Sequence, residues 1–161
     1  MTGVATMVTG VAVVAAAVVA VVVIRRRYLV VTVHGESMLP AYRPGERVLV
    51  RRTPAGALRA GQVVVLRGNS PPPQREALPP GMADLDRTAH ARWIIKRVTA
   101  VPGDPIPRDT VPALRSAPGT RVPAGRLVVL GDNPLRSYDS RRSGYLAAER
   151  LYGVVLRKLG S

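Results

Sequence analysis

Residues 93–104 read Trp-Ile-Ile-Lys-Arg-Val-Thr-Ala-Val-Pro-Gly-Asp, and this stretch decides the fold class. It is rich in β-branched and aromatic residues up to Val101 and ends in Pro-Gly, as is typical of a β-strand followed by a turn. No segment between such runs shows a long helical period, so we expect a mainly β domain. The expected strands are Tyr28–Val33, Arg47–Arg51, Gln62–Leu66, Trp93–Val101, Arg126–Leu130 and Tyr152–Leu156.

Lys96 is the residue in the predicted strand Trp93–Val101 that could carry chemistry. Side chains alternate between the two faces of a strand, so Lys96 shares a face with Ile94, Val98 and Ala100. Burial on an apolar face disfavours the charged amine and lowers its pKa, which makes lysine, unlike arginine, a usable general base. The alternative is an edge-strand lysine whose ammonium group reaches water.

Ser37 follows Gly35 in a predicted turn just after a strand. A serine in a turn can expose its hydroxyl and offer its own N–H to an oxyanion, but the hydroxyl needs an adjacent base. Read alone, Ser37 is an ordinary turn serine. His34 and His90 are rival bases, and a Ser–His–Asp triad would need one of them near an acid such as Asp139.

The N-terminal segment differs from the rest of the chain. Residues 4–24 contain no charge and no proline, and a helix of that length just crosses a bilayer. The run is apolar all round, unlike an amphipathic core helix, and no charged residue precedes it, unlike a secretory signal. We expect a single-pass anchor with a basic flank in residues 1–27 and one domain in residues 28–161. Residues 25–27, all arginine, would favour a cytoplasmic domain under the positive-inside rule.

Composition narrows the function classes further. The 161-residue chain has a formal net charge of +14 and no cysteine, which excludes disulfides and thiolate metal sites. The charges are scattered with few aromatics between them, so we expect anionic lipid head groups rather than nucleic acid as the partner. Residues 68–92 are rich in proline and form a predicted insertion loop.

Three segments, in chain order, resemble the conserved boxes of type I signal peptidases. Ser37-Met38-Leu39-Pro40 is similar to the Ser-Met-x-Pro nucleophile box, and residues 96–104 resemble the Lys-Arg-x-x-Gly-x-Pro-Gly-Asp box. Gly131-Asp132-Asn133 with Ser137–Arg141 resembles the last box. The resemblance spans about residues 32–156. The span from Asp104 to Gly131 is short, which resembles the minimal Gram-positive-like form of the family.

The resemblance implies an antiparallel β-sheet or barrel and a serine endopeptidase with a Ser–Lys dyad. Ser37 would be the nucleophile, Lys96 the general base and later the general acid, and Ser137 the hydroxyl that orients the lysine amine. Asp139 and Arg141 would form a structural ion pair. No metal and no organic cofactor is implied.

The substrate region is also implied by the resemblance. An extended preprotein segment with an Ala-x-Ala site would lie near Gly35, Met38 and Leu39. Gly35 stands where some members have a hydroxyl that helps the oxyanion hole, which would then rest on the Ser37 N–H. Ala100 stands where the family usually has glycine, and its methyl group would either narrow the cleft or help bury the lysine.

The implied function is removal of signal peptides outside the cytoplasm, although the basic flank at residues 25–27 favours a cytoplasmic domain. Three alternatives remain. One is a maturation protease with the same dyad and one private substrate. The second is a self-cleaving repressor of the LexA type, which would need a DNA-binding helix-turn-helix where the apolar run stands. The third is a non-catalytic basic β module that binds nucleic acid or anionic lipid.

Overall fold

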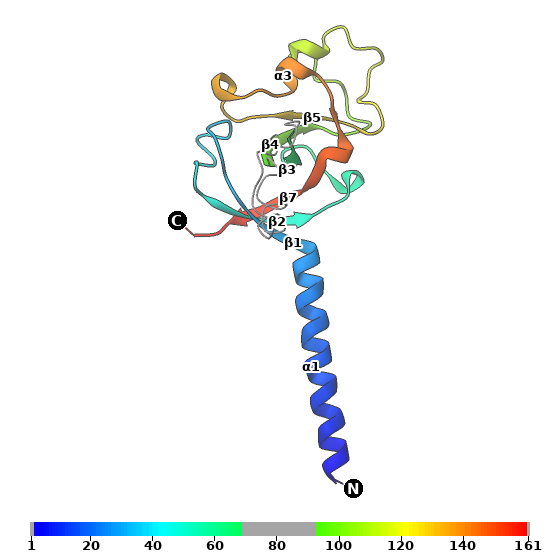
Figure 1. The fold of residues 1–161 in the computed structure, drawn as a ribbon. Helices are drawn as coiled ribbons and strands as arrows, with labels where there is room; N and C mark the ends of the chain where they lie inside the picture. The colour runs from blue at the N-terminus through cyan, green and yellow to red at the C-terminus, as the bar shows by residue number, and fades with distance from the viewer. Residues whose placement is uncertain (1, 69–92, 161) are drawn as a thin grey trace, which may run out of the picture.

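The computed structural model describes residues 2–68 and 93–160, and a long helix leads into a β domain (Figure 1). The predicted insertion loop, apart from Gly68, lies outside the described residues. The helices are α1 (Thr2–Arg27) and the single turn α3 (Ser140–Ser143). The strands are β1 (Tyr28–Thr32), β2 (Arg47–Arg52), β3 (Val63–Arg67), β4 (Trp93–Ala100), β5 (Arg126–Leu130), β6 (Leu146–Ala147) and β7 (Leu151–Lys158).

The described strands form one antiparallel sheet in the order β1-β2-β7-β3-β4-β5-β6. The prediction of a mainly β, antiparallel domain is therefore confirmed. Strand β7 extends beyond its predicted bounds at both ends. Strand β6 was not predicted, because two residues are too short to show an alternating pattern.

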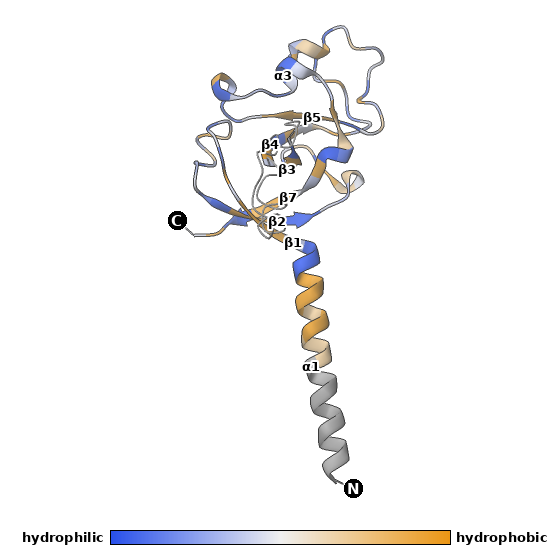
Figure 2. Ribbon diagram, viewed as in Figure 1, coloured by the Kyte–Doolittle hydropathy of each residue, from blue (hydrophilic) through white to orange (hydrophobic). Residues whose placement is uncertain are grey.

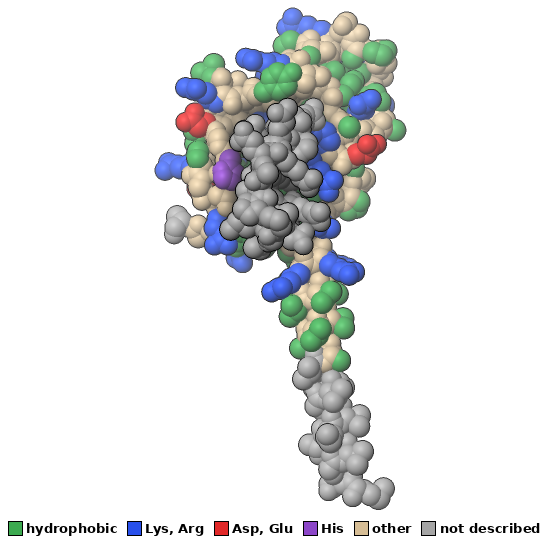
Figure 3. Space-filling view, viewed as in Figure 1, with side chains coloured by type: hydrophobic (Ala, Val, Ile, Leu, Met, Phe, Trp, Pro, Cys, Tyr) green, Lys and Arg blue, Asp and Glu red, His purple; other side chains and the backbone are tan. Residues whose placement is uncertain are grey.

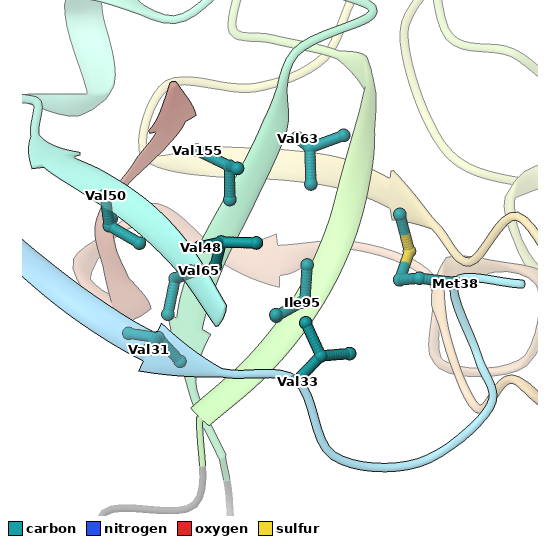
Figure 4. Close-up of a cluster of buried hydrophobic side chains, with 9 residues drawn as sticks. All are labelled: Val31, Val33, Met38, Val48, Val50, Val63, Val65, Ile95 and Val155. Carbon is teal, nitrogen blue, oxygen red and sulfur yellow. The ribbon is translucent and has the colours of Figure 1, made fainter. Parts of the chain in front are cut away.

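Valine, leucine and isoleucine side chains build the core in three clusters. The first joins β1, β2, β3, β4 and β7 and includes Met38 from the loop after β1 (Figure 4). The second lies around Val64, Val98 and Leu127. The third covers the far end of β4 and β5 and includes Ala100, which packs with Val128 and the loop residues between those strands.

Helix α1 ends in three arginines, and its described half is otherwise apolar (Figure 2). Among residues 2–68 and 93–160, no helix meets the combined length and hydropathy that a membrane crossing requires. The predicted anchor in residues 1–27 thus stays a prediction.

Candidate active site

The nucleophile candidate Ser37 lies in the loop between β1 and β2 and is half-buried. Gly35 has a φ of +76°, a conformation that favours glycine, where the chain turns into this loop. At the base of the loop, the Val33 N–H donates to the Glu46 carbonyl over 2.8 Å. The loop is thus closed at its base by backbone hydrogen bonds.

Lys96 lies in the middle of β4, opposite Val64 of β3, and only 4% of its surface is exposed. Its Nζ donates a hydrogen bond of 3.0 Å to Ser137 Oγ. Burial lowers the pKa of Lys96; the negative charge of Asp139 acts in the opposite direction, and the positive charge of Arg141 adds to the lowering. The Lys96 amine therefore becomes neutral at a lower pH than the amine of a solvated lysine does.

Asp139 holds the hydroxyl that contacts the lysine. Its buried carboxylate accepts from Ser137 Oγ over 2.6 Å, from the Gly131 N–H over 2.8 Å and from Arg141 Nη1 over 2.8 Å. It also caps α3 by accepting from the Arg141 N–H. Since the Ser137 proton is directed to Asp139, the oxygen lone pairs of Ser137 face Lys96. The lone pair of the neutral amine then remains available to accept a proton.

The loop between β1 and β2, which carries Ser37 and is called the nucleophile loop below, meets the segment that carries Ser137 at Gly131. A Cβ atom on Gly131 would lie 2.6 Å from the Ser37 carbonyl oxygen and closer still to Ser137 Oγ. Asn133 fixes the same contact, because its N–H donates to the Ser37 carbonyl over 3.0 Å. Ser37 is thereby brought next to the residue that contacts Lys96.

Arg97 connects the Gly131–Asn133 segment to β4. Its guanidinium makes two hydrogen bonds to the Asp132 carboxylate, of 2.9 and 2.6 Å, and a third of 3.0 Å to the Gly61 carbonyl. The hydrogen bonds that Arg97 donates to the Asp132 carboxylate raise the pKa of Arg97. The residue that follows Lys96 therefore holds the Gly131–Asn133 segment against the sheet.

The other predicted site residues lie in different surroundings. Met38 is only 1% exposed and packs in the first core cluster, so it anchors the loop and offers a substrate almost no surface (Figure 4). Leu39 is half-buried and Gly35 is exposed. Ala100 packs in the third cluster, four residues along the strand from Lys96, which is about 13 Å at 3.3 Å per residue. Its methyl group therefore does not narrow the lysine site.

The rival histidine bases do not join this arrangement. His34 is exposed, and no hydrogen bond between described residues joins it to Asp139. His90 lies outside the described residues. Sequence analysis did not predict the contact of Asn133 with the loop that carries Ser37; the available signal was its place beside Gly131 in the last box.

Comparisons with known proteins agree with this geometry. The family model described as "Signal peptidase, peptidase S26" matches residues 6–113 and 108–158. A curated relative, "Probable signal peptidase I-1" from Synechocystis sp. (strain ATCC 27184 / PCC 6803 / Kazusa), is 26% identical over 142 residues, which cover 77% of this chain and 67% of the relative. The chain belongs to the signal peptidase family, peptidase S26, and it is a serine endopeptidase. The resemblance to type I signal peptidases is thus confirmed.

Proposed function

We propose that this protein removes signal peptides from exported preproteins by cleaving after a small residue, with Ser37 as nucleophile and Lys96 as base. The observation that supports this most is the buried Lys96 amine, with a lowered pKa and a 3.0 Å hydrogen bond to Ser137 Oγ. Titratable groups with perturbed pKa values cluster at functional sites, so this amine supports a catalytic role for Lys96. Family membership supports signal-peptide removal at the level of the family.

The proposed reaction follows from these groups. Neutral Lys96 Nζ accepts the Ser37 Oγ proton while Oγ bonds to the scissile carbonyl carbon. The oxyanion that forms accepts a hydrogen bond from the Ser37 N–H. The Lys96 ammonium then gives its proton to the leaving amine as the peptide bond breaks. Lys96 next takes a proton from water, whose oxygen bonds to the acyl carbon. The Lys96 ammonium then returns this proton to Ser37 Oγ as the ester bond breaks, which frees the serine and leaves a neutral lysine.

We further propose that α1 anchors the enzyme in a membrane as a single pass, with the domain outside the cytoplasm. Residues 4–24 carry no charge, and the apolar side chains of residues 18, 19 and 21–24 are exposed. Lys and Arg side chains gather where α1 meets the domain, suited to anionic head groups (Figure 3). A reporter fused after Ser161 tests this topology. A reporter signal that shows the fusion point to lie in the cytoplasm would contradict the proposed location of the domain.

A maturation protease with one private substrate is the second candidate. The observation that favours it is the arginine flank at residues 25–27, which by the positive-inside rule places the domain in the cytoplasm, away from exported preproteins. Such an enzyme would use the same dyad. It would leave a general Ala-x-Ala preprotein intact.

The deciding experiment is cleavage of a preprotein with an Ala-x-Ala site by the full chain in liposomes. We expect the wild type to cut after the second alanine and Ser37→Ala to have no activity. Ser116→Ala, at an exposed serine, is the matched control and should keep full activity. A folded wild type that leaves this preprotein intact would favour the private-substrate protease, and activity in Ser37→Ala would exclude the assigned nucleophile.

A further inference from the structure

Asn133 contacts the nucleophile loop through two separate groups. Its backbone N–H donates to the Ser37 carbonyl over 3.0 Å, and its side-chain Nδ2 donates to the Glu36 carbonyl over 3.2 Å. The two carbonyls belong to the peptide units on either side of the Ser37 Cα atom. Asn133 therefore contacts both peptide planes that determine the direction of the Ser37 side chain, and the Leu39 N–H also donates to the Glu36 carbonyl over 3.2 Å.

The Glu36 carbonyl has a direct relation to the chemistry. It shares its peptide unit with the Ser37 N–H, and in a planar trans peptide the C=O and N–H point in opposite directions. A donor that holds the Glu36 oxygen therefore also fixes the Ser37 N–H, which points in the opposite direction within the same peptide plane. Donation to a carbonyl also polarises the peptide and strengthens its N–H as a donor.

Within the described residues, the Ser37 N–H donates to no backbone carbonyl. It is also the donor on which the proposed oxyanion hole depends, because Gly35 has no hydroxyl to add a second one. An N–H that is turned away from the oxyanion would lose most of its effect on the transition state, since such donors act through their alignment.

We propose that Asn133 is a positioning residue that aims the Ser37 N–H at the oxyanion through its Nδ2 contact with Glu36. This inference rests on the proposed function of Ser37. The role proposed for Asn133 differs from the roles of Ser137 and Asp139, which act on the lysine amine. Asn133 acts only on the transition state, so it should affect kcat and leave KM unchanged.

The test compares Asn133→Ala and the isosteric Asn133→Asp with the wild type on the Ala-x-Ala preprotein. Both variants keep the backbone N–H that binds Ser37 and lose the Nδ2 donor to the Glu36 carbonyl, which keeps the Leu39 N–H as a partner. We expect kcat to fall about 10-fold, less than the 10²–10³-fold that removal of an oxyanion donor costs. KM and, for Asn133→Ala, the pH profile should stay unchanged, because the contacts of Lys96 remain. Gln62→Ala is the matched control, since the one hydrogen bond of its side chain among the described residues is accepted by Oε1 from the Arg59 N–H of a turn.

A second readout separates positioning from general support of the fold. A peptide aldehyde forms a tetrahedral adduct with an oxyanion, whereas the corresponding peptide alcohol does not. Asn133→Ala should weaken binding of the aldehyde about 10-fold, in step with kcat, and leave binding of the alcohol unchanged. An unchanged kcat, or an equal loss of affinity for aldehyde and alcohol, would overturn the proposal. A wild type that cleaves nothing would instead refute the proposed function, and this inference with it.

Discussion

The two lysines of the chain, Lys96 and Lys158, both lie on strands of the same sheet, yet their surroundings differ completely. The Lys158 side chain is 45% exposed and pairs with the Glu46 carboxylate at 2.9 Å. Lys96 is buried and donates to a neutral hydroxyl. Among the described residues, the lysine in the structural role pairs with an acid at the surface, whereas the lysine proposed as a base is buried against a hydroxyl.

The position of Asp139 sharpens this contrast. The Asp139 carboxylate lies two residues beyond Ser137, whose hydroxyl contacts Lys96, but it is paired with Arg141 at 2.8 Å and accepts from Ser137 Oγ. Its attraction for a lysine ammonium is opposed by the arginine charge, so burial determines the direction of the shift and the pKa of Lys96 is lowered. An acid near a lysine therefore does not by itself make that lysine an ion-pair partner.

The largest expected difference between the two lysines is in catalysis. Lys96→Arg should lower kcat/KM by about 10²–10⁴-fold, because arginine cannot give up its proton and general-base catalysis is lost. The matched Lys158→Arg should stay within about twofold of the wild type in the preprotein assay, since an exposed ion pair survives the change. Comparable activity in both variants would remove the distinction between the two sites.

Removing the hydroxyl that contacts Lys96 should have the next largest effect. Ser137→Ala leaves the amine without its 3.0 Å partner, and a misplaced catalytic group can cost about 10²-fold in kcat. Ser143→Ala is the control, because that hydroxyl donates only to the Asp139 carbonyl. Full activity in Ser137→Ala would show that strand β4 alone orients the amine.

A stability measurement examines the same lysine without substrate. Because the pKa of Lys96 is lowered in the folded protein, the unfolded chain binds one more proton between the two pKa values, and wild-type stability should rise with pH there. Lys96→Met should raise Tm, most strongly at the low-pH end of this window. Thermal unfolding at several pH values provides the check, and a Tm difference that does not change with pH would contradict the lowered pKa.

The smallest effect is expected at Glu46, the partner of the other lysine. The hydrogen bond from Lys158, followed by that from the Arg43 N–H, lowers the pKa of Glu46. Its contribution should be present at neutral pH and be lost as pH falls through the folded pKa. Glu46→Gln should therefore lower Tm slightly at pH 7, not at all in strong acid, and leave cleavage unchanged. A large loss of activity would assign this exposed pair to the active site.

Alternation along residues 93–101 was sufficient to predict a strand with Lys96 on its apolar face, because both depend on local periodicity. It left open whether the amine was buried or reached water, because that depends on the strands that pack beside it. The resemblance supplied the candidates Ser37 and Ser137, which no local pattern distinguishes from turn serines. The contacts of Asn133 with Glu36 and Ser37 could not be predicted, because they join loops almost a hundred residues apart. The burial of Met38 was missed for the same reason, since the cluster that covers it is assembled from distant strands.

The strand order has a consequence for the enzyme's own synthesis. Strand β7 lies between β2 and β3, so it joins the half of the sheet that leads to Ser37 with the half that carries Lys96. Before residues 151–158 are added, Ser37 and Lys96 belong to two separate fragments of the sheet. The order of synthesis therefore predicts that the proposed site is completed only when β7 joins these fragments.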